Sequence, residues 1–368
     1  MRMIKGVLFL FFIILTAALF YWIKPHYSDK VYSKPVTVSK KVLPDTIIIA
    51  AVGDIMMGSA FPSTDNLPAD DAKGSFAATE EYLKSADITF GNLEGVFLNY
   101  GNSDKCKTSS TACYAFRMPE RYIQNIVEAG FDVMSVANNH SGDFNAAGRK
   151  RTAEILDSAK INFAGFTTHP STIFKKNGIT YGFCAFAPNE GTVSINDLAN
   201  AKTIISDLKS KVDIVIVSFH GGAEGAKYQH VNRKSEFFYT QNRGNVYQFA
   251  HAVIDAGADL VLGHGPHVTR AVELYKKRFI AYSLGNFCTY GMFNLNGVNG
   301  TAPLMQIKVS NKGEFISANV ISILQRKNQH SIIDPEKNAL NRLQELTASD
   351  FPESELQILN TGMIIPKE

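Results

Sequence analysis

The chain has 368 residues, enough for one large domain or two ordinary ones with a substantial core. Its hydrophobic fraction of 45% and charged fraction of 19% are typical of a globular protein, and its formal net charge is only +3. That small charge, without a basic patch interleaved with aromatic residues and without zinc-finger spacing, excludes a nucleic-acid-binding protein.

An apolar run near the N-terminus predicts a membrane anchor. Residues 7–23 contain a single polar residue, Thr16, and two basic residues precede them. This length is the lower limit for a membrane-spanning helix and exceeds the apolar part of most signal peptides. Trp22 suits the interfacial belt of an uncleaved anchor. A signal cleaved near Thr16 and a buried helix of a soluble domain are the alternatives.

The segment after this run predicts a tether. We assign residues 1–24 to a signal-anchor helix and residues 25–45, which are polar and contain prolines, to a linker between membrane and domain. Lysines follow the apolar run as well as precede it, so the positive-inside count does not fix the orientation of the anchor.

The cysteines bear on the compartment. Cys106 and Cys113 bracket a polar hexapeptide, which suits a local disulfide and hence an oxidising compartment. Two free thiols are the alternative, and the nearby sequence lacks the further ligands of a zinc knuckle. Cys184 and Cys288 lie in apolar runs and are expected to be buried.

From residue 46 onward, strand-like runs alternate with helical patterns, which predicts a layered α/β domain. Pro119 suits a first helical position, Gly130 suits a helix end, and residues 311–313 suit a hairpin turn. The domain is expected over residues 46–326, followed by a C-terminal appendage over residues 327–368. Strands are predicted at residues 47–52, 87–90, 131–137, 179–186, 212–219, 260–262, 278–283, 304–309 and 315–324, and helices at residues 76–85, 119–129, 146–160, 196–211, 245–256 and 336–346.

Five polar clusters follow five of these predicted strands, at residues 53–54, 91–95, 138–140, 220–224 and 263–267. Because open α/β sheets bind ligands at the carboxyl ends of their strands, these clusters together predict one metal site. Taken singly, the first two clusters are also consistent with ordinary turns.

The first two clusters offer oxygen ligands. Asp54 provides a carboxylate for a metal ion, and Gly53 permits a sharp turn of the backbone beside it. Asn92 and Glu94 lie two residues apart, so in extended chain they point to the same face.

The third cluster combines an amide with an imidazole. Asn139 offers an amide oxygen as a metal ligand, and His140 can act as a general acid or bind developing negative charge. Asp143 follows three residues later and can orient the imidazole. A helix N-cap is the alternative role for one of the asparagines.

The last two clusters add imidazoles. His220 ends an apolar run, where a hydrogen-bonded core histidine is the usual reading, but two glycines and Glu224 follow it. His264 and His267 bracket Gly-Pro, so they can ligate one metal or bridge two. The mixed ligand set favours a divalent ion, manganese, iron or zinc, with one or two ions bound. Of the remaining histidines, only His230 lies on a loop that can approach the site.

Six motifs together resemble the CapA family of capsule and poly-γ-glutamate biosynthesis proteins, a branch of the calcineurin-like metallophosphoesterase superfamily. They lie at residues 51–58, 91–95, 137–140, 220–224, 263–268 and 283–287. The resemblance covers about residues 46–325. It implies an α/β fold, a metallophosphatase-like αββα sandwich of two mixed β-sheets flanked by helices, with the N-terminal transmembrane anchor in front of it.

The resemblance also implies roles for individual residues, and two departures from the superfamily pattern accompany them. Met56 stands where the superfamily carries a histidine, and two residues rather than one separate the last pair of histidines. The implied metal ligands are Asp54, Asn92, Glu94, Asn139, His220, His264 and His267; the implied proton donor is His140 with Asp143; the candidate substrate contacts are Glu224 and Asn286.

The function expected from this resemblance is that of a metal-dependent hydrolase or transferase of capsule or poly-γ-glutamate biosynthesis. We expect it in the bacterial inner membrane, single-pass, with its catalytic domain extracytoplasmic and with a cell-envelope polymer and a capsule synthesis complex as partners. A non-catalytic polymer-binding assembly factor with a degenerate metal site is the alternative, favoured by Met56. A cytoplasmic phosphodiesterase with the anchor reversed is a third possibility and requires Cys106 and Cys113 to be reduced.

Overall fold

A computed structural model describes residues 44–105 and 114–367. The anchor predicted at residues 1–24, nearly all of the tether, Cys106 and Cys113 lie outside these ranges. No helix within them is both long enough and apolar enough to cross a lipid bilayer. The described residues belong to a single compact unit.

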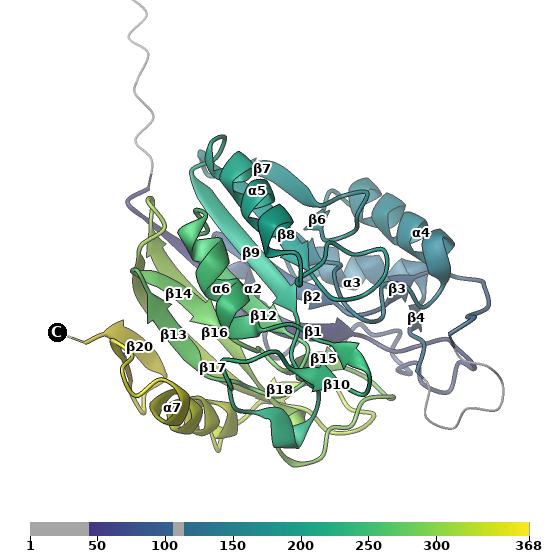
Figure 1. The fold of residues 1–368 in the computed structure, drawn as a ribbon. Helices are drawn as coiled ribbons and strands as arrows, with labels where there is room; N and C mark the ends of the chain where they lie inside the picture. The colour runs from purple at the N-terminus through teal and green to yellow at the C-terminus, as the bar shows by residue number, and fades with distance from the viewer. Residues whose placement is uncertain (1–43, 106–113, 368) are drawn as a thin grey trace, which may run out of the picture. The chain divides into compact units, whose positions relative to one another are not determined.

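Two mixed β-sheets form the centre of this unit (Figure 1). The first runs in the order β19-β20-β17-β16-β1-β2-β5-β6, with β15 beside β1 and β18 beside β17. Its strands are β1 (Thr46–Met56), β2 (Ile88–Leu93), β5 (Val133–Ser135), β6 (Asn162–Ala164), β15 (Asn286–Thr289), β16 (Thr301–Ser310), β17 (Phe315–Leu324), β18 (Ile332–Ile333), β19 (Leu356–Ile358) and β20 (Met363–Pro366).

The second sheet runs in the order β13-β14-β12-β9-β8-β7. Its four middle strands are parallel to one another, and its two edge strands are antiparallel to their neighbours. The strands are β7 (Ser171–Lys176), β8 (Ile179–Phe186), β9 (Ile214–His220), β12 (Leu260–His264), β13 (Val272–Tyr275) and β14 (Arg278–Ala281). Two short ladders lie apart from both sheets, β3 (Val96–Phe97) with β4 (Arg117–Met118) and β10 (Phe237–Phe238) with β11 (Gln241–Asn242).

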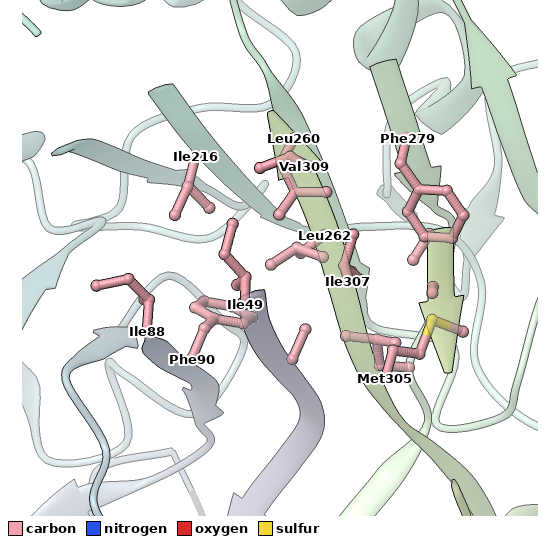
Figure 2. Close-up of a cluster of buried hydrophobic side chains, with 14 of the residues drawn as sticks. Ile49, Ile88, Phe90, Ile216, Leu260, Leu262, Phe279, Met305, Ile307 and Val309 are labelled. Carbon is pink, nitrogen blue, oxygen red and sulfur yellow. The ribbon is translucent and has the colours of Figure 1, made fainter. Parts of the chain in front are cut away.

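Apolar side chains from both sheets fill the space between them (Figure 2). Ile49 of β1 and Phe90 of β2 belong to the same buried cluster as Ile216 of β9 and Leu262 of β12, and all four are fully buried. Burying a side chain of this size stabilises the fold by about 1.5–3 kcal/mol. The sheets are therefore held face to face mainly by non-directional apolar contact.

Helices cover the two outer faces. On the first sheet lie α2 (Glu80–Lys84), α3 (Ile123–Glu128, preceded by the 3-10 turn η1, Glu120–Tyr122) and α4 (Asn145–Ser158). On the second lie α5 (Leu198–Lys209) and α6 (Val246–Asp255), whose Ile205 and Phe249 pack on β9 and β12. The predicted arrangement of two mixed sheets flanked by helices is confirmed.

The C-terminal residues join this arrangement directly. Strand β20 pairs with β17, and α7 (Asn338–Asp350) places Leu340 and Leu343 in the cluster between the sheets. The helix predicted at residues 76–85 begins only at Glu80, because the chain before it runs through successive turns. Strand β7 was not predicted, since this edge strand has only two apolar residues, Ile173 and Phe174, and none of its residues is fully buried.

Burial of two cysteines permits a test of the predicted disulfide. Cys184 and Cys288 are buried, which raises the pKa of both thiols, that of Cys288 to about 12. Because the thiolate is the reactive form, neither should react with Ellman's reagent in the folded protein. The native thiol count should then be two if Cys106 and Cys113 are reduced and zero if they form a disulfide. A native count above two would show that a buried cysteine is reachable.

Candidate metal centre

Strand pairing brings the predicted site residues together. Asp54, near the end of β1, pairs in register with Asn92 of β2 and with Asn286 of β15. His220 and His264 are the last residues of β9 and β12 and pair with each other. All five side chains are fully buried. The site therefore draws its residues from the strand ends of both sheets.

Close polar contacts connect these strand ends. Oδ1 of Asp54 accepts a hydrogen bond from Nδ2 of Asn92 at 2.8 Å and lies 3.2 Å from Nδ1 of His264. Nδ1 of His267 lies 2.9 Å from Oδ2 of Asp54, and its Nε2 lies 3.5 Å from Oε1 of Glu94. Asp54, Glu94 and His267 each present a ligand atom within 4.8 Å of the others, a spacing that one metal ion can occupy.

Glycines allow the backbones around the site to approach closely. A Cβ at Gly53 would lie 1.9 Å from the carbonyl oxygen of Gly285, which accepts a hydrogen bond from the backbone N–H of Asp54 at 2.8 Å. The sharp turn predicted at Gly53 is wrong, since β1 continues through it to Met56; the glycine is needed for contact with the neighbouring turn. Gly265, at φ 117°, has the same role, because a Cβ there would lie 2.5 Å from the carbonyl oxygen of Gly221.

Several buried ligand atoms in the site have no hydrogen-bond partner among the described residues. They include both carboxylate oxygens of Glu94, Nδ1 of His220, both ring nitrogens of His264 and Oδ1 of Asn139. Leaving such an atom buried and unpaired costs about 1–3 kcal/mol, and more when the group is charged. Carboxylate, amide oxygen and imidazole nitrogen are suitable ligands for manganese, iron and zinc, so the residues present fit such an ion.

The electrostatics of the cluster also favour a cation. Burial alone would raise the pKa of Asp54, but contacts with His264 and His267 outweigh it and hold that pKa well below its usual range. Burial raises the pKa of Glu94 well above its usual range. At His267, burial lowers the pKa, but Glu94 and Asp54 outweigh it and raise the pKa to about 10. A metal ion that binds His267 must therefore displace a proton.

His140 is held by one ring nitrogen. Its Nδ1 lies 2.7 Å from Oδ2 of Asp143, whose other oxygen pairs with Lys105. The ring of Phe116 stacks on the imidazole with centroids 3.9 Å apart. Burial lowers the pKa of His140 despite the neighbouring carboxylate. The contact predicted between His140 and Asp143 is present, and it leaves Nε2 as the nitrogen available to a substrate.

A cavity of about 300 Å³, which we call the site cavity, opens beside these residues. His140, Glu224, His267 and Asn286 all line it. Nδ2 of Asn286 donates to the backbone carbonyls of His267 at 3.2 Å and of Asn299 at 2.9 Å, so this amide also fixes the loop that carries His267. Both candidate substrate contacts thus lie next to the candidate proton donor.

Arg243 belongs to the site and was not predicted. Its side chain is buried, and Nη2 donates to Oε1 of Glu224 at 2.6 Å and lies 3.5 Å from Nε2 of His220. Glu224 in turn lies 3.5 Å from Nδ2 of Asn139. Arg243 follows the short ladder of β10 and β11 rather than a core strand, so no strand-end pattern marks it. It neutralises the carboxylate of Glu224, which lines the site cavity.

A buried ion pair supports the loop after β9. Arg270, which is fully buried, donates from both terminal nitrogens to the two oxygens of Glu236, each at 2.7 Å. Oε2 of Glu236 also accepts from the backbone N–H of Ala223 at 2.9 Å. A Cβ at Gly222 would lie 2.9 Å from Arg270. The pair therefore fixes the backbone between His220 and Glu224.

Two other residues do not join the cluster. The side chain of Met56 packs in the apolar cluster under α2–α4, and its sulfur accepts from the backbone N–H of Gly58 at 3.3 Å. The pairing of β1 with β15 shifts by one residue just after Asp54. His230 pairs instead with Asp350 at 2.7 Å, on an exposed loop.

A family model described as the bacterial capsule synthesis protein PGA_cap matches residues 48–290. The capsule biosynthesis protein CapA of Bacillus anthracis is 32% identical over an alignment of 267 residues, which covers 66% of this chain and 60% of that protein. The PGA biosynthesis protein CapA of Bacillus subtilis (strain 168) is 30% identical over 275 residues, 69% of this chain and 66% of that protein.

The chain thus spans less than two thirds of the length of these two relatives. The solved structure of a putative 5'-nucleotidase from Staphylococcus aureus is also similar, with 14% identity and a TM-score of 0.43. The match covers 82% of this chain and 58% of the nucleotidase chain. A similarity this low carries no statement about activity. The family match, in contrast, spans well over half of the sequence and includes all five polar clusters. The chain therefore belongs to the bacterial capsule synthesis protein family PGA_cap.

Proposed function

We propose that this protein is a metal-dependent hydrolase or transferase that acts on a capsular or poly-γ-glutamate-like polymer of the bacterial cell envelope. The observation that carries this proposal is the group of buried, unpaired ligand atoms gathered from both sheets beside the site cavity. The names of the relatives, which refer to capsule and PGA biosynthesis, support the class of polymer.

The ligands of one or two divalent ions would be Asp54, Asn92, Glu94, Asn139, His220, His264 and His267. Such an ion, when bound, polarises a phosphoryl or carbonyl oxygen and lowers the pKa of a water molecule. A pair of ions favours phosphoester chemistry, while a single ion leaves amide chemistry on γ-glutamyl bonds open. Asn92 would also orient Asp54, to which its amide donates.

His140 would transfer the proton. Asp143 holds Nδ1 and Phe116 fixes the plane of the ring, so Nε2 is the nitrogen left to take a proton from the attacking group and deliver it to the leaving group. Arg243 holds Glu224 at the rim of the cavity, where Glu224 and Asn286 would contact the substrate.

The N-terminal sequence supports a membrane location, and the cysteine pair bears on the side of the membrane. The apolar run within residues 1–24 would anchor the protein in the inner membrane with the domain outside the cytoplasm, beside a capsule synthesis complex. A disulfide between Cys106 and Cys113 would support a position of the domain outside the cytoplasm, because disulfides persist in oxidising compartments.

A non-catalytic polymer-binding role is the second candidate. It is favoured by Met56, which packs in the apolar core and supplies no ligand to the cluster, so the site has fewer imidazoles than the superfamily pattern. Such a protein would bind the polymer at the same cavity without turning it over.

Metal analysis combined with an activity screen distinguishes these roles. For a hydrolase, we expect about one equivalent or more of manganese, iron or zinc per chain, with hydrolysis of phosphodiesters or γ-glutamyl amides. Chelation should abolish the hydrolysis, and addition of the metal should restore it. Less than about half an equivalent of any transition metal, together with no hydrolysis of either class, would favour the binding role.

A further inference from the structure

A second cavity lies next to the site cavity. It has a volume of about 560 Å³ and is lined in part by Arg326 and Lys327, and we call it the basic cavity. The two cavities meet along four residues that line both, Tyr114, Met292, Phe293 and Asn294. Tyr114 is 49% exposed and Asn294 is also exposed, so a ligand can lie across this shared wall.

The basic cavity carries positive charge. Arg326 and Lys327 line it, and no carboxylate is among its lining residues. Within residues 44–105 and 114–367, no acidic side chain lies within ion-pair distance of either cation. Asn66, Asn294 and Asn296 add polar side chains around the same space. Two unneutralised cations in a concave, amide-lined space favour an anionic ligand.

A buried side chain fixes this cavity relative to the metal site. Gln325, the residue before Arg326, is buried, and its Oε1 accepts from the backbone N–H of Thr289 at 2.7 Å. Its Nε2 donates to the backbone carbonyl of Asn286, which lines the site cavity. The chain that presents the two cations is therefore attached to the strand that carries a site residue.

We propose that the basic cavity binds an anionic group, a carboxylate or a phosphate, that the substrate carries several bonds away from the bond held in the site cavity. The substrate is then an extended polyanion that crosses Phe293 and Tyr114 from one cavity to the other. The part of this inference that concerns the reacting bond in the site cavity rests on the proposed function. Arg326 and Lys327 lie beyond residues 48–290, so the family match does not supply this site.

Charge reversal at both cations tests the proposal. The full chain in detergent and its R326E/K327E variant would be titrated with two fluorescent probes, a decamer of γ-linked glutamate and an oligomer of glycerol phosphate of similar length. We expect the Kd of at least one probe to rise about tenfold or more in the variant, because two attractive charges become repulsive. The probe whose affinity falls identifies whether the anion is a carboxylate or a phosphate.

The matched control is K202E/K312E, which changes the net charge equally at two exposed lysines that line neither cavity. It should bind both probes within about twofold of the original protein, since distant exposed charges are screened by salt. Thermal unfolding and metal content of each variant would show that the fold and the metal site are intact.

Two results would overturn the inference: neither probe binds the original protein, or both bind R326E/K327E as tightly as they bind the original. Failure of the proposed function is a separate result. If no substrate is hydrolysed while R326E/K327E still loses affinity for a probe, the catalytic role fails and the basic cavity stands as an anion site.

Discussion

Replacement of His267 by alanine is expected to abolish metal binding and turnover while leaving the domain folded. His267 touches Asp54 through one ring nitrogen and approaches Glu94 through the other, so its loss leaves two buried carboxylates without this neighbour. Loss of a partner that merely orients a ligand costs about 10–100-fold in metal affinity, so loss of a ligand should cost more than about 100-fold. Metal content after dialysis measures the loss of the ion, the turnover rate measures the loss of activity, and circular dichroism shows whether the domain is folded.

Two further alanine variants make this result specific. His140→Ala should keep the metal but lower kcat by about 10²–10⁴-fold, because it removes proton transfer without removing a ligand. His169→Ala, at an exposed position away from the site, should change neither metal content nor kcat. If the His267 variant retained a full complement of metal, the assignment of His267 as a ligand would be wrong. If the His140 variant retained full turnover, the proton-transfer role would be wrong.

Replacement of Glu236 by alanine is expected to lower the free energy of unfolding by about 3–5 kcal/mol, a larger loss than for the other single substitutions proposed above and below. The variant leaves the guanidinium of Arg270 fully buried without its carboxylate. It also frees the backbone N–H of Ala223, so the loop between His220 and Glu224 loses its support. Urea unfolding measures the free energy of unfolding. The metal affinity of the variant shows whether the loop between His220 and Glu224 still holds its position.

The control is Glu353→Ala, which removes an exposed partner of Arg233 and should cost less than about 1 kcal/mol. A double variant, Glu236→Leu with Arg270→Met, should recover much of the stability lost by Glu236→Ala, because it leaves no unpaired buried charge. Equal losses in the Glu236→Ala and Glu353→Ala variants would show that the buried pair does not hold this loop.

The sequence indicated which strand ends would come together, and the structure brings these strand ends to one place. Polar residues directly after long apolar runs marked Asp54, His220 and His264, because parallel strands in register align their ends. Strands such as β8 and β17 were predicted with their observed bounds, since their apolar runs end at clear turns. Strand β7 escaped prediction because an exposed edge strand needs no apolar pattern.

What could not be predicted depends on long-range contacts. Arg243 reaches Glu224 only because the ladder of β10 and β11 folds back over the loop after β9, and a single arginine after a polar segment carries no local signal of this. Met56 packs in the apolar cluster under α2–α4, beside residues such as Phe287 that are more than 200 residues away in the chain. A two-residue periodicity along β1 places Asp54 and Met56 on the same face and cannot show this packing.

The division of the metal centre between the two sheets has a consequence for the lifetime of the protein. Asp54 and Asn92 come from one sheet, His220 and His264 from the other, and the apolar contact between the sheets is non-directional. An ion held by both sets of ligands stabilises only the folded state, by about 4 kcal/mol when its free concentration is about 1,000 times its Kd. Starvation for transition metal would then expose the protein to proteolysis, so the amount of this protein would follow the metal supply of the cell.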